Sequence, residues 1–217
     1  MTATPTTKPV EQQFHVRPLR AEDGEAAVAI EAISYPYLEP EHRLLASDVA
    51  IHARVFPEGS FAVVDADDTL WGMALGWRLD FDLERPLHVL DDVADESAHD
   101  PRGDWYYGLD ITVHPAQRGQ GLGGLLYEAR RRLVRAENLR GILAGGMIPG
   151  YRAVMDTVDA PTYIIDVVEG RRTDPTLNFQ LRQGFEVRGL LPGYVNGTAG
   201  GGIATFLVWE NPDHRPT

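Results

Sequence analysis

The sequence predicts a mixed α/β domain with about seven strands and four or five helices. The chain has 217 residues and is 43% hydrophobic, so it can bury one full core. Strand-like runs are interspersed with helix-like runs, and no internal repeat interrupts their order. A glycine-rich turn, "RGQGLGG", joins an apolar, β-branched run to an amphipathic one, which is typical of a strand-to-helix connection.

The first part of the chain is expected to form one strand, two helices and a hairpin. Residues 1–13 are rich in Thr and Pro and are expected to be a flexible segment. "FHVRP" alternates like a short strand, and the stretches 21–38 and 41–55 follow as helices. Residues 61–81 predict a hairpin, with "DADD" as its turn.

The second part is expected to begin with an insertion and then to complete the sheet. The segment at about 82–104 is acidic and proline-punctuated, and it has no sustained periodicity. Trp105–Val113 predicts a strand, leucines behind the glycine turn predict a helix, and "GILAGGMI" is the next strand. A short helix is expected at Ala160–Val168, and another with Thr173 as N-cap and Gly184 as its stop. "FEVRGLL" and "IATFLVWE" are the last two strands.

Composition excludes several classes of function. The chain contains no cysteine, which rules out disulfides and thiolate chemistry, and its seven histidines show no metal-binding spacing, so no metal is expected. A net charge of -12 argues against nucleic acid as a partner and would suit a cationic small molecule. No apolar run approaches the roughly 20 residues of a membrane span, and no signal peptide is evident, so we expect a cytoplasmic protein.

The glycine turn has three interpretations. A dinucleotide-binding fingerprint would need an acid about 20 positions later, and the strand found there, "GILAGGMI", contains none. A purely structural turn would explain the glycines but not the preceding arginine. In the third, the N–H groups from about Gly119 to Gly123 converge on a pyrophosphate at the positive end of a helix, and Arg118 adds charge. We favour the third interpretation.

In this context, "VHPAQRGQGLGGLLYEA" resembles the acetyl-CoA signature RxxGxG of the GNAT superfamily of N-acetyltransferases. More narrowly, "GDWYYGLDITVHP", "GGMIPGY" and "DPTLNFQLRQGFEVRGLLPGY" resemble the acetyltransferase module found fused to nitrilase-like carbon–nitrogen hydrolases. The resemblance implies a single GNAT domain over 14–217, with a mixed sheet splayed between strands 4 and 5. It implies that this strand and turn bind the cofactor, through Ile111, Val113, Arg118, Gly119, Gln120, Gly121, Leu122 and Gly123.

The resemblance also implies a reaction. An acetyl group would pass from acetyl-CoA to the amine of a small acceptor by direct attack in a ternary complex. If the acidic insertion folds over the site, it would favour a polyamine, an aminoglycoside or another cationic amine. We expect no nucleic-acid or membrane partner, and a homodimer is left open.

The candidate catalytic residues begin with the strand before the turn. Asp110 is the one charged side chain in Trp105–Val113. It could serve as base or amine-binding group for an ammonium substrate, or make a structural bond to an arginine or a loop N–H. By strict alternation it shares a face with Tyr106 and Thr112, opposite Tyr107. The resemblance places Tyr107 where some members have a glutamate base, with proton transfer through ordered water as an alternative.

The tyrosine that usually protonates the leaving thiolate is replaced. Gln180 occupies its position in a pattern like FYxxxGF, and an amide cannot act as a general acid. Tyr151 and Tyr194 are the substitute acids, either of which could instead cap a turn, and solvent is a third proton source. A non-catalytic acyl-CoA-binding or sensor module is therefore the competing interpretation. The basic run at Arg130–Arg135 is expected to be mostly solvated.

Overall fold

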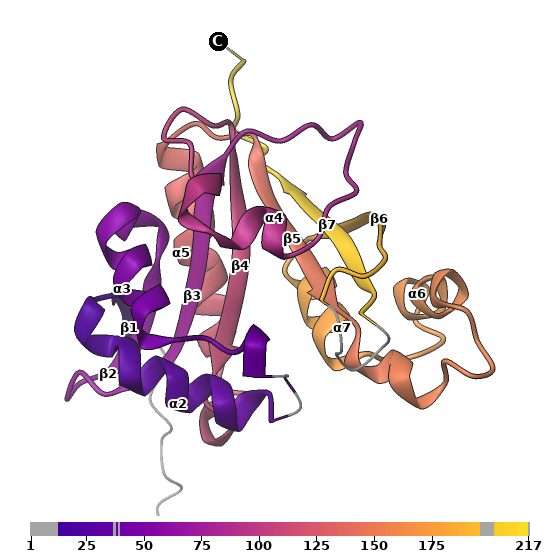
Figure 1. Cartoon of the computed structure of the whole chain (residues 1–217), viewed down its shortest axis with the longest axis horizontal. Coiled ribbons are helices and arrows are strands. Elements are labelled where there is room, and N and C mark those ends of the chain that lie inside the picture. Colours follow the sequence, from indigo (N-terminus) through magenta and orange to yellow (C-terminus); the bar gives the residue numbers. More distant parts are fainter. Residues whose placement is uncertain (1–12, 37, 39, 196–201, 217) are drawn as a thin grey trace, which may run out of the picture.

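The computed structural model describes residues 13–36, 38, 40–195 and 202–216. These residues form one seven-stranded sheet and the helices that cover it (Figure 1). The strand order is β1-β2-β3-β4-β5-β7-β6. Neighbouring strands are antiparallel except for β4 and β5, which are parallel. The predicted mixed sheet is thus confirmed. The predicted flexible segment lies outside the described residues as far as residue 12.

The elements carry the labels of Figure 1. The strands are β1 (Phe14–Pro18), β2 (Phe61–Asp65), β3 (Leu70–Leu79), β4 (Trp105–Val113), β5 (Gly141–Met147), β6 (Glu186–Leu191) and β7 (Ala204–Glu210). The α-helices are α2 (Gly24–Ser34), α3 (Ala46–Val55), α4 (Asp91–Ala94), α5 (Leu122–Ala136), α6 (Ala160–Val168) and α7 (Pro175–Arg182). The single turn α4 lies within the acidic insertion, where sequence periodicity did not predict a helix.

The starts of α3 and α7 differ from expectation because of local capping. The second helix begins at Ala46 rather than near residue 41, because the Asp48 carboxylate accepts the Leu45 N–H at 2.9 Å and fixes the first turn there. The N-cap of α7 is Asp174 rather than Thr173, because the Asp174 carboxylate accepts two N–H groups of the first turn, each at 2.9 Å.

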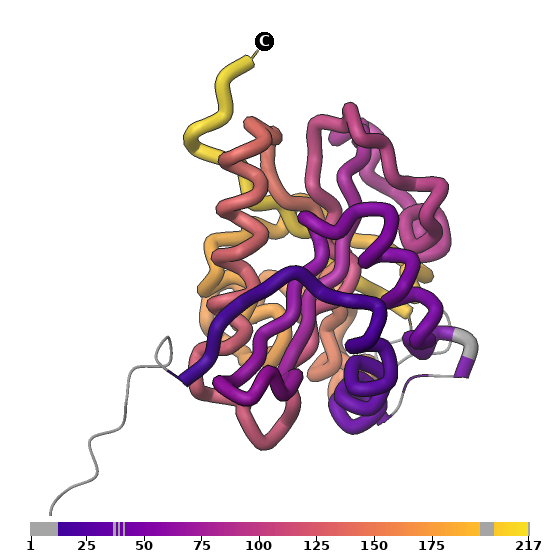
Figure 2. The backbone as a smooth tube through the Cα atoms, turned by 90° about the vertical axis from the view of Figure 1, so that its left-hand side faces the viewer, coloured from indigo at the N-terminus to yellow at the C-terminus, as the bar shows by residue number. Residues whose placement is uncertain are grey.

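Helices cover both faces of the sheet. Leu122 and Leu126 of α5 pack with Val63 and Ala74 on one face, whereas α2 and α3 pack over the other face of β2 and β3. Figure 2 shows α5 on one side of the strands and the two N-terminal helices on the other. The functional strand β4 is therefore enclosed between two layers of helix.

The strands β4 and β5 pair along only part of their length. Trp105–Gly108 pairs with Gly141–Ala144, and beyond these residues the strands separate. Figure 1 shows them adjacent toward the end where the C-terminus lies and apart at the opposite end. The splay that the family resemblance implied is confirmed, and among the described residues no strand pairs with the second half of β4 on that edge.

A bulge interrupts β4 where the splay begins. Leu75 of β3 is paired with Asp110, but the next residue, Gly76, is paired with Gly108. Leu109 is therefore an extra residue in β4, and an extra residue reverses the faces of the side chains that follow it.

The bulge corrects the predicted orientation of Asp110. Its partner Leu75 and the partner of Tyr107, Trp77, are two residues apart on one face of β3. Asp110 therefore shares a face with Tyr107, on the side of α2 and α3, and not with Tyr106. Strict alternation gave the wrong face because a bulge is set by strand pairing and leaves no period in the sequence.

Candidate active site

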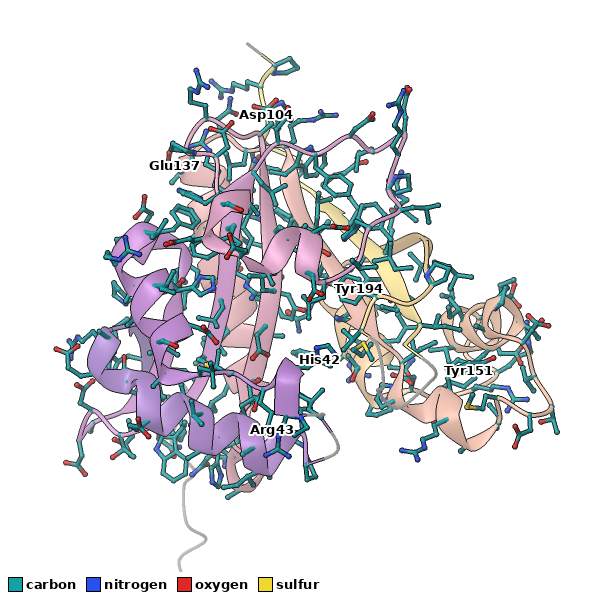
Figure 3. All side chains as sticks on the ribbon, in the orientation of Figure 1. His42, Arg43, Asp104, Glu137, Tyr151 and Tyr194 are labelled. Carbon is teal, nitrogen blue, oxygen red and sulfur yellow. The ribbon has the colours of Figure 1, made fainter. Side chains whose placement is uncertain are left out.

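A cavity of about 560 Å³ opens where β4 and β5 separate. Residues of α2, α3, β4, the acidic insertion, the end of β5 and α7 line it. Figure 3 shows His42, Arg43 and Tyr194 around this part of the molecule. The lining is acidic, with five carboxyl groups against a single arginine among the described residues: Glu31, Asp48, Asp91, Asp95 and Asp110.

Asp110 is half-buried and lines the cavity together with a buried acid, Glu31. The Asp110 carboxylate accepts a hydrogen bond from Thr112 Oγ1 at 2.8 Å, and burial raises its pKa. Glu31 is 4% exposed and accepts the Leu44 N–H at 3.1 Å. Burial, and secondarily the charge of Asp110, raise the pKa of Glu31. Two coupled carboxyl groups at one cavity can attract a cation and exchange a proton with it.

Sequence reasoning missed Glu31, although a signal was present. The apolar positions Ala27 and Ile30 mark the buried face of α2, and Glu31 falls on that face at helical spacing. Burial of an unpaired charge is unfavourable, so an acid on a buried helix face usually has a charged or hydrogen-bonding partner. Such an acid is therefore a candidate functional residue.

His52 of α3 adds a neutral base to the same wall. Its ring stacks on Trp77 with centroids 3.8 Å apart, and burial lowers its pKa to about 4. The Gly76 backbone opposes this lowering of the pKa, and the buried Nδ1 atom has no hydrogen-bond partner among the described residues. The ring is therefore uncharged at neutral pH.

The structure brings together two tyrosines that the sequence analysis named separately. The hydroxyls of Tyr107 and Tyr194 lie 3.0 Å apart, and Nε2 of His88 lies 2.6 Å from the Tyr107 hydroxyl. Burial raises the pKa of Tyr194 to about 12, and burial and the adjacent Tyr194 raise that of Tyr107. His88 belongs to the insertion, and no sequence pattern linked it to β4.

The other two named residues of the thiolate step lie in different surroundings. Tyr151 is buried with its ring 5.3 Å from that of Tyr163, outside the described lining of the cavity, and Figure 3 shows it beside α6. Gln180 does line the cavity. It is 6% exposed, and its Oε1 has no partner among the described residues.

The glycine turn has the backbone geometry expected of an anion cradle. Gly119 and Gly121 have φ angles of 78° and 92°, which are favourable for glycine alone among common residues. The N–H groups from Gly119 to Gly123 donate to no acceptor in the described part of the chain. They stand at the N-terminus of the 15-residue helix α5, where the helix dipole is positive.

The side chains of the turn have distinct roles. Arg118 is exposed, and its Nε donates to the Val113 carbonyl at 3.2 Å. The Gln120 side chain donates to Gln117. Leu122 is buried in the core, so any ligand contact there belongs to its backbone. A Cβ on Gly123 would lie 2.7 Å from the ring of Phe179, so this glycine also allows α7 to approach.

The unpaired half of β4 is held by side chains. The Ile111 carbonyl accepts the Tyr35 hydroxyl at 3.3 Å, and the Val113 carbonyl accepts Ser34 Oγ at 3.4 Å. These bonds are at the long end of the hydrogen-bond range. A ligand with stronger hydrogen-bond donors could therefore replace these side-chain bonds to the β4 carbonyls.

A buried arginine holds the bulge. Arg130 of α5 is 1% exposed, and its Nη2 donates to the carbonyl of Leu75 at 2.7 Å and to that of Asp110. A Cβ on Gly108 would lie 2.8 Å from Nη1, so glycine makes room for the guanidinium. The expectation that this basic run is mostly solvated is wrong for Arg130, because the bulge leaves carbonyls that need a donor.

No helix among the described residues is long and apolar enough to cross a membrane. Within the same residues, no group of three or more His, Cys, Asp or Glu side chains is arranged to hold a metal ion.

Known proteins are similar in sequence to this chain over most of its length. The family model described as "Acetyltransferase (GNAT) family" matches residues 25–153. "Probable hydrolase YhcX" of Bacillus subtilis (strain 168) is 31% identical over 210 residues, which is 95% of this chain but 40% of YhcX. "Uncharacterized N-acetyltransferase YkwB" of the same organism is 28% identical over 193 residues, covering 87% of this chain and 85% of YkwB. The chain thus spans well under half of YhcX and most of YkwB.

Solved structures share the fold. The GNAT-like decarboxylase GphF, in complex with isobutyryl-CoA, has a TM-score of 0.76 at 21% identity, over 90% of this chain and 98% of its own. The loading GNATL domain of CurA from Lyngbya majuscula has a TM-score of 0.76 at 20% identity, over 91% of this chain and 97% of its own. Because the family model covers more than half of the chain, and because the splayed sheet agrees with it, the chain belongs to the GNAT family of acetyltransferases.

Proposed function

We propose that this protein transfers an acetyl group from acetyl-CoA to the amine of a small cationic acceptor. The observation that supports this most strongly is an acidic cavity at the β4–β5 splay, followed along the chain by a turn of unengaged N–H groups. The acidic cavity suits a positively charged amine, and the turn of N–H groups suits a pyrophosphate. An enzyme that joins the two substrates needs both features around one strand.

The chain's residues fit CoA as a cosubstrate. The N–H groups from Gly119 to Gly123 would hold the pyrophosphate, and nothing lies within 4 Å of a Cβ position on Gly119, so the turn is open. Arg118 would add a charge-assisted contact. The backbone of Ile111 and Val113 would hold the pantetheine arm in exchange for weak side-chain bonds. When bound, acetyl-CoA supplies a thioester that is activated toward nucleophiles.

The acceptor amine would bind on the other side of β4. An alkyl ammonium has a pKa near 10.4 and must lose a proton before it can attack a thioester. Asp110 and Glu31 would attract the ammonium, and their raised pKa values bring them closer to the range where a carboxylate is an effective base. The insertion supplies Asp91 of α4 and Asp95, the residue after α4, to the cavity lining, which extends the negative field outward.

Two alternatives arise for the same cavity, one from a structural neighbour and one from Gln180. GphF is described as a decarboxylase, and that activity is known here only as a description of GphF. A carboxylated acyl group would meet like charges in this cavity, so decarboxylation is less compatible with its five carboxyl groups. A non-catalytic acyl-CoA-binding module is the remaining alternative, and it is motivated by Gln180 in place of the usual acid.

Release of CoA thiol from acetyl-CoA, measured over a panel of amines, tests the proposal. The panel should contain a polyamine, an aminoglycoside, a neutral amine and an acidic amino acid. We expect turnover that favours the polycationic acceptors. CoA binding without thiol release from any acceptor would instead support the binding module, and preference for the acidic amino acid would contradict the assignment of the cavity.

A further inference from the structure

Three side chains from distant segments form a continuous hydrogen-bonded row that ends at the cavity. They are His88 in the acidic insertion, Tyr107 in β4 and Tyr194 after β6. Their separations are 2.6 Å from His88 Nε2 to the Tyr107 hydroxyl and 3.0 Å from that hydroxyl to the Tyr194 hydroxyl. Tyr194 lines the cavity, so one end of the row faces the site described above.

The surroundings fix the direction of every hydrogen bond in the row. His88 Nδ1 lies 2.6 Å from the Pro86 carbonyl, which can only accept, so Nδ1 carries the proton of the neutral ring. Nε2 then accepts from Tyr107. Because the one hydroxyl proton of Tyr107 is used for that bond, Tyr194 must donate to Tyr107.

The cavity end of the row lies where the strands separate. A Cβ on Gly145 would overlap the ring and hydroxyl of Tyr194, so the phenol end rests directly on the Gly145 Cα. Gly145 follows Ala144, the last β5 residue paired with β4. Since the Tyr194 proton points toward Tyr107, lone pairs of its oxygen remain to accept a proton from a group in the cavity.

Resting on the proposed function, we propose that Tyr194, Tyr107 and His88 form a proton relay that deprotonates the acceptor ammonium and then protonates the leaving thiolate. Tyr194 is the catalytic residue, because it borders the cavity where the reacting atoms would meet. Tyr107 and His88 act through it. This relay would supply the acid that Gln180 cannot supply.

The proton transfers balance. The ammonium gives a proton to the Tyr194 oxygen, Tyr194 gives its own to Tyr107, and Tyr107 gives its own to Nε2 of His88, which becomes an imidazolium. The amine forms a bond to the thioester carbon, and the carbon–sulfur bond then breaks with its electron pair on sulfur. The protons then return, from His88 to Tyr107, from Tyr107 to Tyr194 and from Tyr194 to the thiolate sulfur. The nitrogen, now bonded to the acetyl carbon, loses its second proton to solvent.

The environment of His88 suits a group that holds a proton only briefly. Phe81, Tyr194 and Phe206 surround its ring, with centroids 5.2, 5.7 and 5.9 Å away. Burial lowers the His88 pKa, while Asp92 is the charged group that opposes this effect. The imidazole is therefore neutral at rest, and its imidazolium readily returns the proton.

Kinetics of single-hydroxyl variants test the relay. Tyr194→Phe should lower kcat by about 10² while the CoA dissociation constant stays within twofold, because general acid–base groups contribute about 10² to 10⁴. Tyr107→Phe and His88→Gln should lower kcat at least tenfold. His88→Gln should also remove a titration below pH 6.5 from the kcat/KM profile. The matched control is Tyr106→Phe, whose hydroxyl bonds the Gly59 carbonyl on the opposite face of β4. It should stay within twofold of wild type.

Different outcomes overturn the relay and the proposed function. An active wild type with unchanged kcat in Tyr194→Phe would overturn the relay and leave the acetyltransferase proposal standing. A wild type that releases no thiol with any amine would overturn the acetyltransferase proposal. In that case, or if a variant fails to fold, ¹⁵N NMR of wild-type His88 tests the row itself. Nδ1 should be protonated and Nε2 unprotonated, and the opposite tautomer would overturn the relay.

Discussion

Removal of the Arg130 side chain should destabilise the fold far more than removal of any other arginine in its run. In Arg130→Ala, the carbonyls of Leu75 and Asp110 lose a charged donor inside the core. An unsatisfied buried carbonyl costs about 1 to 3 kcal/mol. Two of them, with the space vacated by a side chain that is 1% exposed, give a loss of about 4 kcal/mol in the free energy of unfolding.

Thermal and urea unfolding followed by circular dichroism measure this loss. For a chain of this length, about 4 kcal/mol corresponds to a fall in Tm of roughly 8 to 16 °C. The matched control is Arg132→Ala in the same helix, whose side chain is 77% exposed and should change the free energy of unfolding by less than about 0.5 kcal/mol. Equal effects of the two substitutions would refute the assignment of Arg130 as the donor that holds the β4 bulge.

Three further predictions concern the site. Asp110→Asn should lower kcat by about 10² with an unchanged Tm, and a fall in Tm with little change in kcat would indicate a structural role instead. Arg118→Ala should weaken CoA binding about tenfold by calorimetry, and an unchanged affinity would refute the cradle. His52, whose pKa is lowered to about 4, should make wild-type stability fall by roughly 3 kcal/mol as the pH drops from 6.5 to 4, because the unfolded chain binds the proton first. His52→Gln should flatten that slope, and a slope equal to that of wild type would contradict the assignment.

Local patterns predicted most of the secondary structure and the turn. The apolar, β-branched run Trp105–Val113 and the leucine spacing of α5 are properties of neighbouring residues, so they can be recognised without the fold. The glycines at 119 and 121 are required by the positive φ angles of the turn itself. The N-cap of α7 was misplaced by one residue, since Thr173 and Asp174 are both good capping residues and only their geometry separates them.

The missed features depend on contacts between distant segments. The bulge at Leu109 exists only in the pairing of β4 with β3, and it changes which side chains share a face with Asp110. Arg130 is buried because that bulge presents carbonyls to α5. His88 reaches Tyr107 only because the insertion folds back along the sheet. None of these relations leaves a period or a motif in the sequence.

A crystal structure of the protein with CoA and an acetylated polyamine product would test the central claim most directly. It should show the pyrophosphate on the N–H groups from Gly119 to Gly123 and the CoA sulfur within hydrogen-bond reach of the Tyr194 hydroxyl. The charged amines of the product should lie against Glu31 and Asp110. CoA bound elsewhere, or a product that lies away from these two carboxylates, would contradict the account.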